Sequence, residues 1–128
     1  MDAYQTHGAF SWSELTTSDP GKATEFYGTL FGWKVENMDM GTGPYYVVKV
    51  GETGVGGIMG FPPGVEGVPP NWCPVVTVKD VDETARQCTS MGGKVLAGPL
   101  DVPTVGRYAV LQDPQGAAIS VITYSMPG

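Results

Sequence analysis

The stretch Gly106-Arg-Tyr-Ala-Val-Leu-Gln-Asp-Pro-Gln-Gly-Ala-Ala-Ile-Ser-Val-Ile122 decides the fold of this chain. Its two ends are rich in residues that favour β-strands, and Asp113-Pro-Gln-Gly116 lies between them. In that segment proline presets φ, aspartate can accept hydrogen bonds from nearby backbone, and glycine tolerates a positive φ. The stretch therefore predicts a β-hairpin.

A weaker copy of this hairpin lies in the first half of the chain. Residues 43–50 match its first strand, residues 52–54 its turn and residues 55–59 its second strand, so that Gly54 and Gly116 are 62 positions apart. Two predicted helices begin at Asp19 and Asp80, 61 positions apart, and each follows a predicted strand. The order strand, helix, strand, hairpin thus occurs twice. It predicts two modules, at about residues 9–61 and 72–124, within a single domain of residues 1–128.

Helix signals fix the two helices more closely. Asp19 is predicted to cap the first helix, with Pro20 at its first position, and Gly32 to end it. The residues expected to face a sheet recur at helical spacing. They are Ala23, Phe26, Tyr27 and Leu30 in the first helix and Val81, Ala85, Cys88 and Met91 in the second. Residues 99–106 are predicted to form a loop, and the proline-rich residues 61–71 a linker.

Composition excludes several classes of function. The chain has 128 residues, a hydrophobic share of 41% and a net charge of −6, which fit a globular protein without nucleic acid or an anionic membrane as partner. The sequence has no apolar run long enough to span a membrane, and its N-terminus does not have the pattern of a signal peptide. We therefore expect a cytoplasmic protein. Cys73 and Cys88 are expected to be free thiols.

The chain resembles the vicinal oxygen chelate superfamily, which includes glyoxalase I, extradiol dioxygenases and bleomycin-resistance proteins. The segments that carry the resemblance are Ser18-Asp-Pro20, Glu25-Phe-Tyr27, Leu30-Phe-Gly-Trp33, Val78-Lys-Asp-Val81, Gly92-Gly93 and Asp113-Pro-Gln-Gly116. Residues 106–116, preceded by Gly98-Pro99, resemble a subgroup of small glyoxalase-like proteins. The resemblance implies an α+β fold. Two tandem βαβββ modules would form a curled mixed sheet, or cup, with the helices on its outer face.

Enzymes of that superfamily hold a divalent metal on ligands from the first and last strands of each module. Carried over by spacing, these positions are Trp12, Ile58, Cys73 and Ser120, and the internal repeat relates them in the same way. Tryptophan and isoleucine cannot ligate a metal, serine is a weak ligand, and one cysteine does not form a site. His7 lies in an N-terminal tail, although the tail could fold inward. We therefore expect no metal and no other cofactor.

The remaining candidate site is an apolar cup with a few polar groups. Its predicted ligand contacts are Trp12, Glu14, Ile58, Cys73, Arg107 and Ser120. Trp12 and Glu14 lie on one face of the first strand, where a ligand cation could contact both, but Trp12 could equally fill the cup as core. Arg107 could pair with Asp101 or Glu14, or hold an anionic ligand group.

Three functions follow from these residues. The first, which we expect, is a metal-independent small-molecule-binding protein of the bleomycin-resistance type. The second is a metal-free lyase- or isomerase-like enzyme with Glu14 as general acid or base, distinct from a conventional metal-dependent glyoxalase I or extradiol dioxygenase. The third is a non-catalytic scaffold with a filled cup. In each case we expect a homodimer, because curled sheets have edges to protect.

Overall fold

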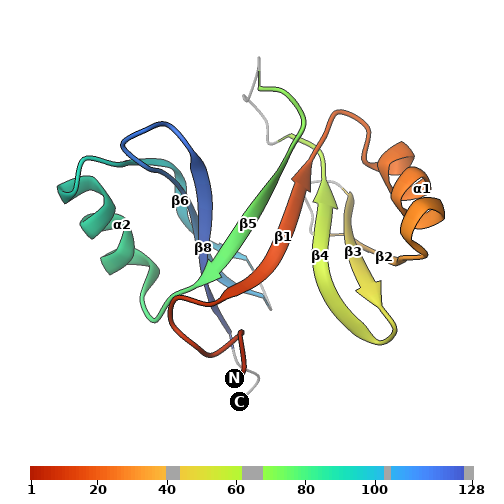
Figure 1. Cartoon of the computed structure of the whole chain (residues 1–128), viewed down its shortest axis with the longest axis horizontal. Helices are drawn as coiled ribbons and strands as arrows, with labels where there is room; N and C mark the ends of the chain where they lie inside the picture. Colours follow the sequence, from red (N-terminus) through yellow and green to blue (C-terminus); the bar gives the residue numbers. More distant parts are fainter. Residues whose placement is uncertain (40–43, 62–67, 103–104, 126–128) are drawn as a thin grey trace. The chain divides into compact units, whose positions relative to one another are not determined.

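A computed structural model describes residues 1–39, 44–61, 68–102 and 105–125 of the chain (Figure 1). The chain divides into two compact units. The first unit is Trp12–Trp72, and the second is Cys73–Gly128 together with the N-terminal Met1–Ser11. The division after Trp72 lies next to the predicted start of the second module. Among the described residues, neither helix is long and apolar enough to cross a membrane.

The first unit is a four-stranded mixed sheet with one helix. Its elements are β1 Phe10–Thr16, α1 Pro20–Phe31, β2 Lys34–Asp39, β3 Pro44–Val50 and β4 Thr53–Met59, with the strands in the order β2-β3-β4-β1. β1 runs parallel to β4, and the other neighbours are antiparallel. The core between sheet and helix contains Leu15, Val48 and Ile58, with Ala23 and Tyr27 of α1 packed against them.

Helix α1 begins and ends where its sequence predicts. The Asp19 carboxylate accepts a hydrogen bond from the Lys22 backbone N–H at 3.0 Å, Pro20 is the first residue, and Gly32 ends the helix with φ of 73°. The prediction for two of its apolar side chains is wrong, since Phe26 is 61% and Leu30 58% exposed. Ala23 and Tyr27 are the residues of α1 that pack against the sheet. Because successive residues of a helix are about 100° apart around its axis, Phe26 and Leu30 are turned to the side of this contact.

The second unit repeats this arrangement. Its elements are β5 Asn71–Thr77, α2 Val81–Ser90, β6 Lys94–Val102, β7 Gly106–Gln112 and β8 Ala118–Tyr124, with the strands in the order β5-β8-β7-β6. β5 runs parallel to β8, and both β7 pairings are antiparallel. Val81 and Ala85 of α2 are buried, together with Ala109, Leu111 and Val121 of the sheet. By contrast, each of the 12 residues of α1 remains at least partly exposed to solvent.

Two expectations for the second unit are wrong. Met91 is 77% exposed, because α2 ends at Ser90 and Met91 caps it. The predicted loop at residues 99–106 is wrong for residues 99–102, since β6 continues to Val102 and Asp101 pairs with Arg107, and residues 103–104 lie outside the described residues. Pro99 does not end the strand because β6 is at the edge of its sheet, where a missing N–H is tolerated.

The predicted hairpin at the end of the chain is confirmed. The Asp113 carboxylate accepts hydrogen bonds from the backbone N–H groups of Gln115 and Ala117, at 2.9 and 3.0 Å, and Gly116 has φ of 103°. The fold is therefore the predicted α+β arrangement of two tandem βαβββ modules. The N-terminal tail is ordered on the second unit, where the Gly8 N–H donates to the Thr77 carbonyl at 2.7 Å.

Candidate functional site

The candidate site lies on the face of the first unit's sheet that points away from α1, called here the helix-distal face. Side chains alternate along a strand, so residues next to the helix-facing Leu15 and Tyr46 must point the other way. This alternation places Trp12 and Glu14 of β1 and Tyr45 of β3 on the helix-distal face. The prediction that Trp12 and Glu14 share a face holds within this unit.

Ile58 does not belong to this group, which corrects the prediction. It is 0% exposed and pairs with Leu15 in the core against α1, whereas Gly57 pairs with Glu14. In the second unit the equivalent pair is Val75 with Ser120, so Gly57 is the counterpart of Ser120. The first hairpin has a shorter turn than the second and a register shift after Val48. The residue equivalent to Ser120 is therefore one position earlier than the spacing predicts. A shift of one residue turns a side chain to the opposite face of a sheet.

A chain of hydrogen bonds joins the three side chains of the helix-distal face. The Trp12 indole N–H donates to the Tyr45 hydroxyl oxygen at 3.2 Å. The Tyr45 hydroxyl is in turn hydrogen-bonded to the Glu14 carboxyl group. Indole is only a donor and a phenol carries one proton, so Tyr45 accepts from Trp12 and donates to Glu14. The carboxylate is thereby held in place, with further acceptor positions on its two oxygens.

Two glycines of β4 make room for the aromatic side chains. A Cβ atom at Gly57 would overlap the Tyr45 hydroxyl group. A Cβ atom at Gly54 would lie 3.4 Å from the Trp12 ring. Sequence reasoning missed Tyr45 and these glycines as parts of the site. The closely spaced glycines in residues 54–57 were the available signal, because glycine within a strand often marks a close approach.

The environment of Glu14 changes its acidity. Burial raises its pKa from 4.5 to about 6, and the hydrogen bond from Tyr45 acts in the opposite direction. The charged form is disfavoured where water is excluded. With a pKa of about 6, Glu14 is mostly ionised at pH 7 and can still take up a proton in mild acid. The group can therefore act as a fixed anion or as an acid or base.

The second unit brings Cys73 and Ser120 together. The Cys73 sulfur lies 3.5 Å from the Ser120 hydroxyl oxygen. Val121, the next residue along β8, packs into the core against α2, so Ser120 points away from that helix. Among the described residues, Cys73 and Cys88 are free thiols, as predicted.

Arg107 is held by two carboxylates of its own unit. Its guanidinium group makes a two-point contact with Asp82 of α2, at 2.8 and 2.9 Å, and an ion pair with Asp101 at 3.1 Å. The hydrogen bonds with Arg107 lower the pKa of Asp82, and those with both carboxylates raise the pKa of Arg107. The pairing with Asp101 is as predicted. Asp82 was missed because it lies on a different element.

The side chains at the positions expected for metal ligands do not fit a divalent ion. Trp12 offers an indole, and the register places Gly57 rather than Ile58 beside Glu14. The His7 Nδ1 atom accepts a hydrogen bond from the Lys79 backbone N–H at 3.0 Å. Within the described ranges, there is no group of three or more His, Cys, Asp or Glu side chains that could hold a metal.

Comparison with known proteins agrees with this fold. Residues 9–121 match the family model described as the Glyoxalase/Bleomycin resistance protein/Dioxygenase superfamily. The chain is 43% identical to the putative glyoxylase CFP32 of Mycobacterium tuberculosis, over 90% of this chain and 44% of that protein. It is 36% identical to the anthracycline biosynthesis protein DnrV of Streptomyces peucetius, over 90% of this chain and 41% of that protein. The chain thus spans less than half the length of these relatives.

Solved structures share the fold at low sequence identity. Methylmalonyl-CoA epimerase from Streptomyces coelicolor aligns with a TM-score of 0.67 at 18% identity, covering 94% of this chain and 100% of that one. The epimerase from Mycobacterium tuberculosis aligns with a TM-score of 0.64 at 16% identity, covering 93% and 89%. Repeated βαβββ modules, their strand order and the match over residues 9–121 lead to one conclusion: this chain belongs to the glyoxalase/bleomycin resistance protein/dioxygenase superfamily.

Proposed function

We propose that this chain is a metal-independent small-molecule-binding protein of the glyoxalase/bleomycin-resistance type. Its ligand contacts Trp12, Tyr45 and Glu14 on the helix-distal face. The observation that carries the proposal is the hydrogen-bond chain from Trp12 through Tyr45 to Glu14, which fixes a carboxylate beside an indole ring. Apolar surface with a few well-placed polar groups is the usual composition of a small-molecule site.

The site chemistry favours an organic cation. Glu14 is mostly ionised at neutral pH, and Tyr45 occupies only part of its hydrogen-bonding capacity. The Trp12 ring offers a π-face to a positive group, which gains about 0.5–2 kcal/mol depending on desolvation. The net charge of −6 also attracts cations. The prediction that Cys73 and Ser120 contact a ligand concerns the second unit and stays a separate prediction.

The names of related proteins support a small organic ligand. One relative is named for anthracycline biosynthesis, and proteins of the same fold are methylmalonyl-CoA epimerases. These names describe those proteins, and the first concerns a chain more than twice as long as the matched segment. They nevertheless agree with a fold that is used repeatedly for small molecules.

Tetramethylammonium tests the proposal directly, because it is an organic cation without an aromatic group. Its binding should move the Trp12 indole signal in a ¹H–¹⁵N correlation spectrum. Glu14→Gln should weaken the affinity roughly tenfold, equivalent to about 1.4 kcal/mol. Glu36→Gln, which removes an exposed carboxylate that pairs with Lys49, is the matched control and should bind normally. Equal affinity in the Glu14→Gln variant and the wild type would overturn the assignment.

Metal independence needs its own measurement. The proposal rests on the donor set, in which an indole and a glycine take the places of ligands in the first unit. Elemental analysis after gel filtration without chelator should find no stoichiometric zinc, nickel, manganese or iron. About one such ion per chain would contradict this part of the proposal.

An acid–base enzyme is the second candidate, and the pKa of Glu14 favours it. A carboxyl group with a pKa of about 6 can exchange a proton near neutral pH, as lyase- and isomerase-type reactions require. Native mass spectrometry of freshly purified protein would identify a carried-through molecule to use as the trial substrate. Turnover that is lost in Glu14→Gln while that molecule still binds would favour the enzyme over the binding protein.

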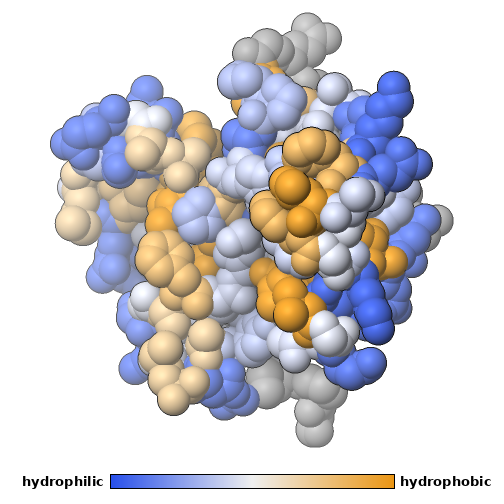
Figure 2. Space-filling model, turned by 45° about the vertical axis from the view of Figure 1, so that its right-hand side comes forward, coloured by the Kyte–Doolittle hydropathy of each residue, from blue (hydrophilic) through white to orange (hydrophobic). Residues whose placement is uncertain are grey.

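We also infer a homodimer that acts in the cytoplasm. Free thiols at both described cysteines agree with a reducing compartment. Leu30 and Phe31 of α1 are 58% and 57% exposed, and apolar side chains gather on this side of the molecule in Figure 2. Exposed apolar surface of this kind often marks an interface. Sedimentation at micromolar concentration should give twice the chain mass, and a monomer alone would contradict the inference.

A further inference from the structure

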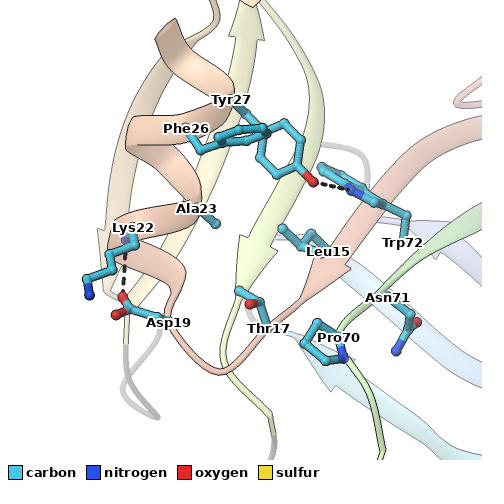
Figure 3. Close-up of a pocket in the computed structure, with 10 residues that line it drawn as sticks. All are labelled: Leu15, Thr17, Asp19, Lys22, Ala23, Phe26, Tyr27, Pro70, Asn71 and Trp72. Carbon is cyan, nitrogen blue, oxygen red and sulfur yellow. Dashed lines mark hydrogen bonds between the residues drawn. The ribbon is translucent and has the colours of Figure 1, made fainter. Parts of the chain in front are cut away.

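A crevice lies on the other side of the first unit's sheet from the helix-distal face. It has a volume of about 350 Å³, lies between α1 and residues 70–72, where β5 begins, and is called here the α1 crevice (Figure 3). Its lining residues all belong to the first unit and include Leu15, Thr17, Ala23, Phe26, Tyr27 and Trp72. Leu15 faces α1, whereas Trp12 and Glu14 point away from it. The crevice is therefore separate from the helix-distal face.

Aromatic rings form the walls of this crevice and are fixed by one another. Tyr27 is the centre of the cluster, with its ring 5.0 Å from Phe26, 5.4 Å from Trp72 and 5.8 Å from Trp33, measured between centroids. The contacts with Phe26 and Trp72 are edge-to-face, the arrangement that aromatic pairs prefer. Trp72 is 38% and Phe26 61% exposed, so both still offer ring surface to a ligand.

The hydrogen bond inside the cluster leaves one donor for a ligand. The Trp72 indole N–H donates to the Tyr27 hydroxyl oxygen at 3.2 Å, as Figure 3 shows. Tyr27 must therefore direct its own proton elsewhere. Within the described parts of the chain, we find no acceptor for that proton. Asp19 and Lys22, one acidic and one basic residue, also line the crevice, and the Lys22 side chain points away from Tyr27 and Trp72 in Figure 3.

We propose that the α1 crevice binds a planar aromatic molecule of one or two rings that carries an acidic oxygen group, such as an aromatic carboxylate. The rings of Phe26 and Trp72 would contact the ligand ring. The Tyr27 hydroxyl would donate to the ligand oxygen. The volume of about 350 Å³ lies at the small end of ligand pockets, which suits a molecule of this size.

The tryptophans provide a reporter for each site. The chain has three tryptophans, and each gives one indole signal in a ¹H–¹⁵N correlation spectrum. Trp72 lines the α1 crevice and Trp12 lies on the helix-distal face. Naphthalene-2-carboxylate should move the Trp72 signal in a saturable way and leave the Trp12 signal in place. Assignment by Trp72→Phe and Trp12→Phe identifies the two signals.

Two comparisons decide the chemistry. Tyr27→Phe keeps the ring and removes the donor, so it should weaken naphthalene-2-carboxylate about fivefold, the usual effect of one hydrogen bond. The cation 2-(aminomethyl)naphthalene has the same rings without the acidic oxygen and should bind more weakly than the carboxylate. Circular dichroism would confirm that the variant is folded. The proposal fails if Trp72 does not respond, if Tyr27→Phe binds as well as wild type, or if both probes bind equally.

This outcome is independent of the proposed function. Tetramethylammonium tests Trp12 and Glu14, and naphthalene-2-carboxylate tests Trp72 and Tyr27. A shift of the Trp12 signal alone by the carboxylate would assign that ligand to the helix-distal face and overturn the α1 crevice. A shift of the Trp72 signal alone would support the crevice whether or not the cation binds.

Discussion

The two units share the order of their elements but differ in the residues at equivalent positions. In the first unit the face away from the helix has Trp12, Tyr45 and a carboxylate that titrates near pH 6. In the second unit the corresponding face has the neutral pair Cys73 and Ser120, and its charged pair lies between α2 and β7. A repeated backbone thus supports different chemistry, because the side chains at equivalent positions differ and two glycines of β4 leave room for aromatic rings in the first unit.

The strongest test of this difference is Gly57→Ala. The added methyl group would displace the Tyr45 hydroxyl, so we expect a loss of about 1–3 kcal/mol in unfolding free energy, typical of overpacking. The hydrogen bond that lowers the pKa of Glu14 would also be lost, so its pKa should rise further. Urea unfolding followed by tryptophan fluorescence measures the first effect, because all three tryptophans lie in the first unit.

Two controls separate this mechanism from a general loss of fit. Ser120→Ala changes the equivalent position of the second unit without adding an atom, and should cost clearly less than Gly57→Ala. Adding Tyr45→Ala to Gly57→Ala removes every ring atom that the added methyl group would meet, so the double variant should lose less than the two single losses together. Additive losses would mean that Gly57 and Tyr45 do not interact.

Acid should affect the two units in opposite directions. Glu14 has a pKa of 4.5 when unfolded and about 6 when folded, so stability should rise as the pH falls from 6 to 4.5, by roughly 2 kcal/mol at most. Asp82 has its pKa lowered below 3.8, so its contribution is present above pH 3.8 and is lost as the pH falls through the folded pKa. Urea unfolding midpoints measured at about five pH values between pH 3 and pH 7 would show both changes in stability.

Variants assign each part of that pH profile. Glu14→Gln should remove the rise below pH 6 and make the protein more stable at pH 7. Asp82→Asn should weaken the fall below pH 3.8 and leave the rise unchanged. A Glu14→Gln profile that matches wild type would show that another group titrates in this range.

The smallest expected effect belongs to Arg107→Lys. Lysine cannot reproduce the two-point contact with Asp82, but these side chains are 37% and 43% exposed, and ion pairs in contact with water contribute little. The thermal midpoint of the variant should be slightly below that of the wild type. The difference between them should shrink in about 1 M salt, where the screening length is roughly 3 Å. Arg86→Lys, which changes a more exposed pair with Glu83, should have a smaller effect still. A larger loss than in Gly57→Ala would contradict this ranking.

Local signals allowed much of the fold to be predicted. Three of these signals each determine the backbone conformation of only a few neighbouring residues: Asp19, Gly32 and the turn at Asp113. The structure confirms all three. The resemblance to the superfamily added the order of the modules. The exposure of Phe26 was not predictable from helical spacing, which gives the apolar stripe but not how much of it the sheet can cover.

The site was less predictable because it depends on strand register. Ile58 was assigned to the wrong face since a bulge inside a hairpin leaves no clear sequence signal, and one residue reverses the face. Tyr45 was missed although the closely spaced glycines of residues 54–57 were a signal for it. The contact of Arg107 with Asp82 joins residues 25 positions apart on two elements, so spacing along either element could not reveal it.

The incomplete burial of α1 has a consequence for the dynamics of the protein. α2 anchors itself with the buried residues Val81 and Ala85, whereas α1 contacts its sheet through partly exposed side chains. Segments with few buried apolar contacts open locally at lower free energy than the rest of a domain. Backbone amides of α1 should therefore exchange with deuterium sooner than those of α2. The α1 crevice would then have one wall that can yield as a ligand enters.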